Sequence, residues 1–143
     1  MPNDKTFSLD WHQEAPYSIK GSEFIQLWAP AINDVGKLNG SIKVLENSNS
    51  AGVVETDDFI PDVGHAQYKP KQKVMDKFVE KQIELKFGQV LLFSNTLIHK
   101  SGDNNSQFPR LTLLAHYHNP LNKKFLEAMG QKEIEPPSRN TYK

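Results

Sequence analysis

Three side chains that lie far apart along this chain could hold one metal ion. His12 and Glu14 are separated by a single residue, so on an extended strand both side chains point to the same side. A second imidazole about one domain-length later, such as His99, would place two histidines and one carboxylate on one side of a metal. This ligand set leaves the other coordination positions open, as in the facial triads of non-haem Fe(II) centres.

Arg110 is a candidate for binding an anion. Its guanidinium presents a planar fork of donors that suits a carboxylate, and it begins an alternating stretch, RLTLLAHYH, that predicts a strand over residues 110–118. A buried, unpaired guanidinium would be costly, which favours an anionic ligand or a carboxylate partner. The alternative is a surface arginine or a member of an ordinary ion pair.

Other polar residues have competing interpretations. His116 and His118 form a His-x-His pair that is a rival ligand set, although roles as rim or interior polar residues explain them as well. His65 is expected in a loop, as a hydrogen-bonded structural histidine. Ser101 precedes a glycine, where its hydroxyl could bond its own backbone. The lysines between residues 69 and 81 predict a solvated helix face.

The composition excludes several classes of protein. The 143 residues suffice for about one domain. Lys+Arg and Asp+Glu, 17 of each, cancel to a net charge of zero, which favours small-molecule ligands over nucleic acid or membranes. No cysteine is present, so any metal must use histidine, carboxylate or water. The opening residues have neither a basic nor an apolar targeting region, and no apolar run reaches about 20 residues. We therefore expect a cytoplasmic protein.

Short strands and apolar runs dominate the expected secondary structure. Turn signals at Asp34-Val35-Gly36 and Asn39-Gly40 separate the earlier ones. Residues 46–66 are expected to form a long loop that contains one short strand. The predicted strands and apolar runs cover residues 5–9, 23–29, 41–45, 53–55, 83–87, 89–94, 96–99 and 110–118.

Two helices complete the expected elements. Residues 70–82 place apolar side chains at helical spacing between charged ones, and residues 121–129 do so before a terminating Gly130. The pattern as a whole predicts an all-β barrel or sandwich of jelly-roll type. We expect one domain over residues 1–130, followed by a loosely ordered tail over residues 131–143.

Two stretches of the sequence resemble the phytanoyl-CoA dioxygenase family. The first is WHQE with a nearby tyrosine, followed by Trp28 and the pattern Asp-x(4)-Asn-Gly that begins at Asp34. The second is GQVLLFSNTLIHKSGDNNS, with Arg110 eleven positions after its histidine. The resemblance runs from about Trp11 to His118. It implies an Fe(II)- and 2-oxoglutarate-dependent dioxygenase on a double-stranded β-helix, a jelly-roll or cupin-like fold.

The resemblance also assigns roles to individual residues. It implies that Fe(II) is held by His12, Glu14 and His99, and that the far carboxylate of the co-substrate 2-oxoglutarate is held by Ser101 and Arg110. Trp28 and Tyr17 are expected either to wall the same pocket or to serve as plain structural aromatics.

The implied reaction is hydroxylation of an unactivated C–H bond of a small organic substrate. It uses dioxygen and releases succinate from 2-oxoglutarate. Related halogenases have a small residue in place of the metal-binding carboxylate, so Glu14 argues against halogenation.

Two departures from the family pattern support an alternative. The family has aspartate where Glu14 stands, and the extra methylene requires another rotamer or a shifted backbone. Only ten residues precede Trp11, fewer than is usual for the family, so we expect an N-terminally truncated core. An open strand edge would favour a homo-oligomer. The alternative function is a β-helix domain without turnover, acting as a metal-binding, small-molecule-binding or structural module.

Overall fold

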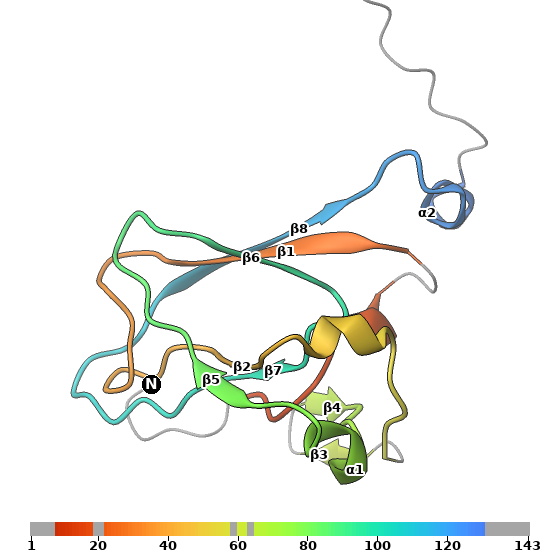
Figure 1. Ribbon diagram of the computed structural model, residues 1–143. Helices are drawn as coiled ribbons and strands as arrows, with labels where there is room; N and C mark the ends of the chain where they lie inside the picture. Colours follow the sequence, from red (N-terminus) through yellow and green to blue (C-terminus); the bar gives the residue numbers. More distant parts are fainter. Residues whose placement is uncertain (1–7, 19–21, 58–59, 63–64, 131–143) are drawn as a thin grey trace, which may run out of the picture.

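Two antiparallel sheets face each other in the computed structural model, which describes residues 8–18, 22–57, 60–62 and 65–130 (Figure 1). In the upper sheet of Figure 1, a central strand is flanked by two others in the order β6-β1-β8, and in the lower sheet the order is β5-β2-β7. The upper strands are β1 (Phe24–Pro30), β6 (Leu91–Ser94) and β8 (Thr112–His118). The lower strands are β2 (Lys43–Leu45), β5 (Glu80–Gln82) and β7 (His99–Lys100).

Alternation along β1 separates the interior of the protein from its surface. Phe24, Gln26 and Trp28 are buried on the face toward the lower sheet, whereas Ile25 on the opposite face is 51% exposed. This two-residue period follows from the pleat of a strand. The main apolar core lies between the sheets, with Trp28, Val35, Ile42 and Phe93 as its buried members.

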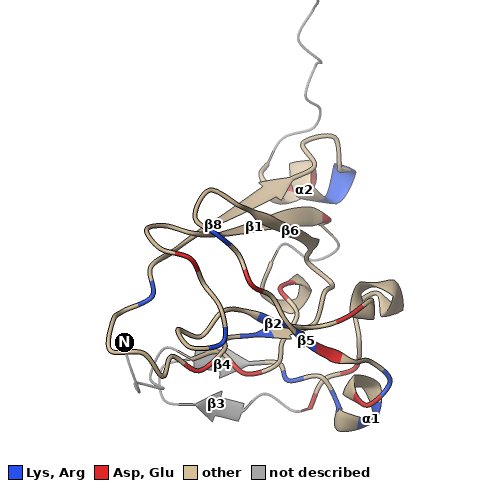
Figure 2. Ribbon diagram, turned by 60° about the vertical axis from the view of Figure 1, so that its left-hand side comes forward, with Lys and Arg blue, Asp and Glu red and all other residues tan. Residues whose placement is uncertain are grey.

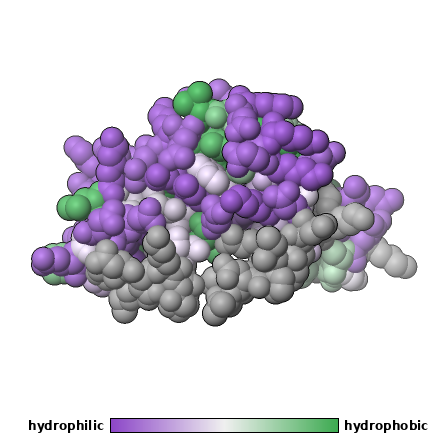
Figure 3. All heavy atoms as spheres, turned by 90° about the horizontal axis from the view of Figure 1, so that it is seen from below, coloured by the Kyte–Doolittle hydropathy of each residue, from purple (hydrophilic) through white to green (hydrophobic). Residues whose placement is uncertain are grey.

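A second apolar cluster attaches a short helix to the lower sheet. Trp11, Leu45, Ile98 and Met75 form this cluster. Met75 comes from the helix α1 (Gln72–Met75), which therefore packs beside β2. Seen from below, the surface around this region is mostly hydrophilic, with small apolar patches (Figure 3).

Gly40 makes the predicted reversal before β2 possible. Its φ of 78° lies in the left-handed region, and a Cβ there would come within 2.5 Å of the carbonyl oxygen of Gly102. Only glycine satisfies both conditions. The turn thereby lets the residues that follow β7 pack closely against the start of β2.

The second predicted helix is confirmed in a slightly shorter form. It is α2 (Lys123–Ala128), and the side chain of Asn122 caps it by accepting a hydrogen bond from the N–H of Phe125 at 3.1 Å. Gly130, with φ at 71°, follows its end as expected. Two 3-10 turns, η1 (Ala15–Tyr17) and η2 (Ser48–Ala51), complete the helical elements of the described residues.

The predicted helix over residues 70–82 is largely wrong. Only Gln72–Met75 is helical, and Glu80–Gln82 instead forms β5. The reason is tertiary: β5 pairs with β2 in the register Lys43↔Gln82, Val44↔Lys81 and Leu45↔Glu80. A sheet edge available for pairing therefore outweighed an amphipathic helical pattern.

The expected loop over residues 46–66 also contains more structure than predicted. It includes η2 and the strand β3 (Ile60–Asp62), which pairs with β4 (His65–Gln67). The strand expected at Val53–Glu55 is absent from these described residues, because the N–H of Val54 is taken by the side chain of Gln13.

Three further segments differ from the prediction or lie outside the described residues. Residues 83–87 form a single bridge, Val35↔Leu85, rather than a strand. Of the strand expected over residues 5–9, the described residues Ser8 and Leu9 are not in a strand, and the rest lies outside the described residues, as does the tail from 131 onward.

The described helices are all short. None of them is long and apolar enough to cross a membrane. Charged residues of both signs are spread over the molecule, and β8 has none (Figure 2).

Candidate metal centre

Backbone pairing brings the two distant histidines together. The N–H of His12 donates to the carbonyl of His99, and the N–H of His99 donates to the carbonyl of His12, both at 3.0 Å. His12 thus extends the lower sheet beyond β7 by one antiparallel bridge. The side chains of such an opposed pair leave the sheet on the same face. Their rings lie side by side, with centroids 4.3 Å apart.

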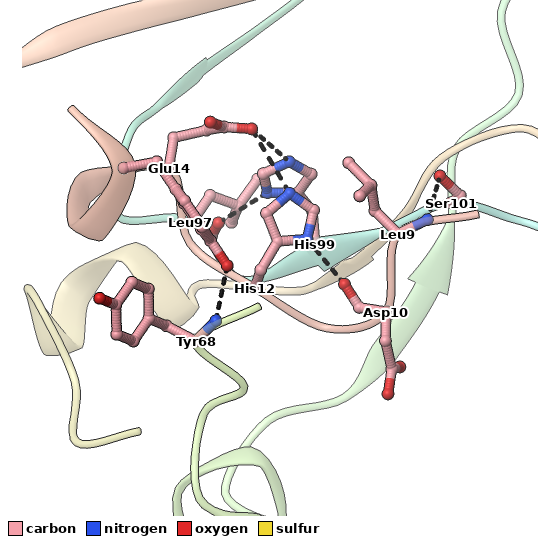
Figure 4. Close-up of polar contacts among 9 residues, drawn as sticks. Leu9, Asp10, His12, Glu14, Tyr68, Leu97, His99 and Ser101 are labelled. Atoms are coloured by element: carbon pink, nitrogen blue, oxygen red, sulfur yellow. Dashed lines mark hydrogen bonds and ion pairs between the residues drawn. The ribbon is translucent and has the colours of Figure 1, made fainter. Parts of the chain in front are cut away.

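Glu14 completes a cluster of three potential metal ligands. Its Oε1 lies 3.4 Å from Nε2 of His12 and 3.6 Å from Nε2 of His99. One ligand atom from each of the three residues lies within 4.8 Å of the others. Figure 4 shows both imidazoles pointing their Nε2 atoms at the carboxylate. The residues predicted from the His-x-Glu spacing and from His99 therefore converge.

The other ring nitrogen of each histidine is held by the backbone. Nδ1 of His12 lies 2.7 Å from the carbonyl oxygen of Asp10, and Nδ1 of His99 lies 3.0 Å from that of Leu97 (Figure 4). A carbonyl can only accept, so each Nδ1 must carry the hydrogen. Each neutral ring then presents a lone pair at Nε2, which is the arrangement that orients a metal-binding histidine.

Burial and mutual contact shift the ionisation of the cluster. Burial raises the pKa of the Glu14 carboxyl, but the adjacent imidazoles of His12 and His99 outweigh burial, so this pKa lies well below its ordinary value. Burial lowers the pKa of His99, more than its contact with Glu14 raises it. The cluster is therefore poised as a carboxylate with a neutral His99 at neutral pH.

The donor set fits a divalent first-row metal such as iron. Imidazole nitrogens and a carboxylate oxygen are ligands for such ions. Nε2 of His12 is buried and has no hydrogen-bond partner among the described residues, an arrangement that a bound cation would satisfy. Glu14 reaches both imidazoles from its own backbone position, so its extra methylene does not take the carboxylate away from the cluster.

Gln13 is a positioning residue that the sequence did not single out. Its side chain is almost fully buried, and its Nε2 donates to the carbonyls of Gly52, at 2.8 Å, and Thr96. Its Oε1 accepts from the N–H of Val54 at 3.0 Å. Because His12 and Glu14 flank it, this clamp fixes the segment that carries two of the three potential metal ligands. The sequence offers one indication of this role, because Gln13 lies between His12 and Glu14 and its side chain should point to the opposite side of the chain.

Arg110 lies beside Trp28. The guanidinium carbon lies 5.9 Å from the centroid of the Trp28 ring. Burial lowers the pKa of Arg110, and its Nη1 is buried without a hydrogen-bond partner among the described residues. A desolvated, unpaired cation of this kind is satisfied best by an anion.

Two clefts are found among the described residues. The larger, about 920 Å³, is lined by Arg110 together with Val35, Leu85 and Phe108, and none of the three metal-ligand candidates lines it. The smaller, about 590 Å³, is lined by Asn95 among others. None of the three metal-ligand candidates lines it either, but the N–H of Ala15, next to Glu14, donates to the carbonyl of Asn95 at 3.0 Å, which links this cleft to the segment of Glu14.

Ser101 and Tyr17 occupy different surroundings. Ser101 lies just after β7, where its Oγ accepts from the N–H of Leu9 at 3.3 Å (Figure 4). No described contact joins it to Arg110. Tyr17 lies edge-on to His12, with centroids 6.2 Å apart, and its hydroxyl accepts from the N–H of Tyr68 at 2.6 Å. Tyr17 therefore borders the metal-ligand cluster, whereas Ser101 joins two backbone segments.

The rival histidine pair lies elsewhere. His116 and His118 are on β8, and each ring contacts Phe24 at a centroid distance of 4.7 Å. Nδ1 of His118 is 2.9 Å from Oγ of Ser22. Among the described residues, neither joins the cluster of potential metal ligands. The backbone of His65 is in β4 rather than a loop, and its side chain lies outside the described residues.

The family assignment follows from these features and from a direct comparison. A profile of the phytanoyl-CoA dioxygenase (PhyH) family matches residues 2–112. The chain therefore belongs to this family, as its two motif stretches predicted. No curated protein is detectably similar in sequence.

Solved structures of similar fold support the same architecture. The epimerase SnoN in complex with Fe3+, alpha ketoglutarate and nogalamycin RO has a TM-score of 0.64 at 19% identity, over 80% of this chain and 43% of that one. EvdO2 from Micromonospora carbonacea var. aurantiaca, complexed with 2-oxoglutarate, gives 0.59 at 15% identity, over 78% and 47%. AviO1 from Streptomyces viridochromogenes Tue57 gives 0.56 at 21% identity, over 79% and 44%.

These comparisons establish the fold. The predicted mainly β, jelly-roll or cupin-like architecture with two short helices is confirmed. The chain spans less than half the length of each of these three structures.

Proposed function

We propose that this chain is an Fe(II)- and 2-oxoglutarate-dependent oxygenase domain that hydroxylates an unactivated C–H bond of a small organic substrate. The observation that carries the proposal is the convergence of His12, Glu14 and His99 on one point, with ligand atoms within 4.8 Å of one another. Iron bound there would supply the activation of dioxygen, coupled to oxidative decarboxylation of 2-oxoglutarate to succinate.

The protein contributes the orientation of the ligands. The carbonyls of Asp10 and Leu97 hold the imidazoles as Nδ1–H tautomers, so both Nε2 lone pairs are available without a proton leaving. Glu14 supplies one negative charge. Two neutral rings and one carboxylate leave a divalent ion with a net positive charge, which suits an anionic co-substrate.

Arg110 is proposed to bind the far carboxylate of 2-oxoglutarate. Its side chain is half-buried, and its buried Nη1 lacks a protein partner among the described residues. The face of Trp28 beside it would limit the orientations open to the bound acid. Ser101 is proposed to donate a second hydrogen bond to the same carboxylate. Its Oγ accepts from the N–H of Leu9, which leaves the hydroxyl proton free to point elsewhere.

The substrate is proposed to approach through the smaller cleft beside Asn95. This cleft borders the segment of Glu14, whereas the larger cleft has Arg110 in its wall. Among the neighbours of similar fold are an epimerase and a non-haem monooxygenase. Analysis of the product would distinguish hydroxylation of the substrate from epimerisation or another oxidation.

The alternative is a domain that binds the metal and co-substrate without turnover. Glu14 in the place of the family's aspartate favours it, because the longer side chain changes where the carboxylate oxygen meets the ion. Incubation in air with Fe(II) and 2-oxoglutarate separates the two. The enzyme forms succinate with the parent chain and none with His99→Ala. No succinate from an iron-loaded parent would leave only the binding module.

A further inference from the structure

The upper sheet has an open edge at β8. β8 is seven residues long, and on one side it pairs with β1 from Thr112 opposite Pro30 to His118 opposite Phe24. In the described part of the chain no strand pairs with its other side. Sheet edges of this kind are templates for another strand.

The hydrogen-bond parity shows which backbone groups of β8 face away from β1 and have no strand partner among the described residues. The carbonyl of Leu111 accepts from the N–H of Ala31, and the N–H of Asn119 donates to the carbonyl of Glu23. Odd-numbered residues of β8 therefore direct their backbone groups at β1. Alternate residues of an antiparallel strand direct theirs to the opposite side. The groups on the open edge belong to Thr112, Leu114, His116 and His118.

The other edges of the two main sheets are shorter, contain charged residues, or already pair with another segment. The edge strand β5 has three residues and includes Glu80 and Lys81, charges of the kind that discourage pairing. β7 is followed in the lower sheet by the bridge to His12. β6 has four residues. β8 is the longest edge and contains no Lys, Arg, Asp, Glu or Pro (Figure 2).

The side chains of β8 are exposed on both faces. Leu113 and Tyr117, on the outer face, are 60% and 61% exposed, and Leu114 on the inner face is 56% exposed. Ile25 of β1 adds to the outer apolar face. Large apolar residues gathered along an unpaired edge are typical of an interface.

We propose that β8 pairs antiparallel with β8 of a second copy of this chain, across a two-fold axis at Ala115. Only this register places every unpaired backbone group of one strand opposite one of the other. His116 then pairs with Leu114, and His118 with Thr112.

The side chains of the outer face are also complementary in this register. Leu113 lies opposite Tyr117 on both sides of the two-fold axis, and the two copies of Ala115 meet on the axis. An aliphatic residue opposite an aromatic one is a favourable cross-strand pair, and no charges oppose each other. The identical strand is thus its own complement, as a two-fold interface requires.

Charge at position 115 tests this pairing. In sedimentation velocity over a concentration series, the parent chain is expected to double its mass from 16.3 kDa. Ala115→Lys and Ala115→Glu each place like charges on the axis and should weaken dimerisation at least about tenfold. An equimolar mixture of the two variants should restore the dimer, which also shows that both are folded.

Leu92→Lys is the matched control. Leu92 lies on the same outer face, 61% exposed, but on β6 at the far side of the sheet. This variant should dimerise like the parent. A monomeric parent, a dimer that survives both substitutions at Ala115, or equal dissociation by Leu92→Lys would each overturn the proposal. So would a monomer whose Leu114 and His116 amides resist hydrogen exchange, because a segment of the same chain would then cover the edge.

Discussion

His12 and His99 exchange both of their backbone hydrogen bonds, at 3.0 Å in each direction. Because this bridge fixes the two backbones relative to each other, the centroids of the imidazoles stand 4.3 Å apart. Glu14 then needs only its own side chain to reach both Nε2 atoms. Backbone pairing between two segments far apart in the sequence therefore positions the cluster.

Replacing Glu14 by glutamine should weaken metal binding. The substitution keeps the length of the side chain but removes the only negative charge of the cluster. We expect the Fe(II) dissociation constant to rise at least about tenfold, measured by anaerobic competition with a chelator. Glu127→Gln, on the exposed side of α2, is the control and should bind like the parent. Equal affinity in Glu14→Gln would remove Glu14 from the ligand set.

Replacing Gln13 by alanine should destabilise the fold and loosen the site. The change leaves two buried carbonyls and the N–H of Val54 without their side-chain partner. We expect a loss of about 2–4 kcal/mol in the free energy of unfolding, measured with urea. Gln72→Ala removes one exposed hydrogen bond and should cost less than about 0.5 kcal/mol. A similar loss in both variants would show that Gln13 is no special clamp.

Arg110 should control co-substrate affinity without affecting the metal. Arg110→Lys keeps a charge but loses the planar fork, so we expect the 2-oxoglutarate dissociation constant to rise about tenfold, and more for Arg110→Ala. Calorimetric titration of the metal-loaded protein measures it. Fe(II) affinity should stay within about twofold in both variants, because Arg110 is not in the ligand cluster. An unchanged 2-oxoglutarate affinity in Arg110→Ala would contradict its assigned role.

The metal-free protein should lose stability as the pH falls below the ordinary histidine range. Burial lowers the pKa of His99 in the folded chain from an ordinary value of 6.5. The unfolded chain then binds more protons, so stability rises with pH across this window. The contribution is fully present above about pH 6.5 and declines as the pH falls toward the folded-state pKa. Urea unfolding between about pH 7.5 and 5 should show this slope, and His99→Gln should flatten it. An equal slope in both would rule out His99 as its source.

The sequence predicted the ligand-bearing segments better than the elements around them. His12 and Glu14 were singled out because a one-residue spacing on an extended chain places both side chains on one side. His12 lies in a bridge, but the backbone of Glu14 is αR, with φ −76° and ψ −24°, and its side chain reaches the imidazoles from there. β8 was found because its alternation is long, and β1 because it is rich in β-forming residues and ends at Pro30. By contrast, β5 was mistaken for helix, because Glu80–Gln82 acquires its strand conformation only from pairing with β2.

Contacts made across the fold were not accessible from local pattern. The clamp of Gln13 depends on Gly52, Val54 and Thr96, three backbones that no period in the sequence links to it. The carbonyl of Leu97 that orients His99 is likewise a backbone group without a sequence signature. Ser101 illustrates the same limit, because its contact with Leu9 arises from segment pairing rather than from its own turn.

Anaerobic titration of the protein with Fe(II) and then 2-oxoglutarate tests the central claim most directly. If His12, Glu14 and His99 hold iron with open positions beside them, the co-substrate should chelate it and produce a visible metal-to-ligand charge-transfer absorption band. The band should saturate at one equivalent of iron per chain, disappear in His99→Ala, and require more 2-oxoglutarate in Arg110→Ala. Absence of the band at saturating iron and 2-oxoglutarate would contradict the account.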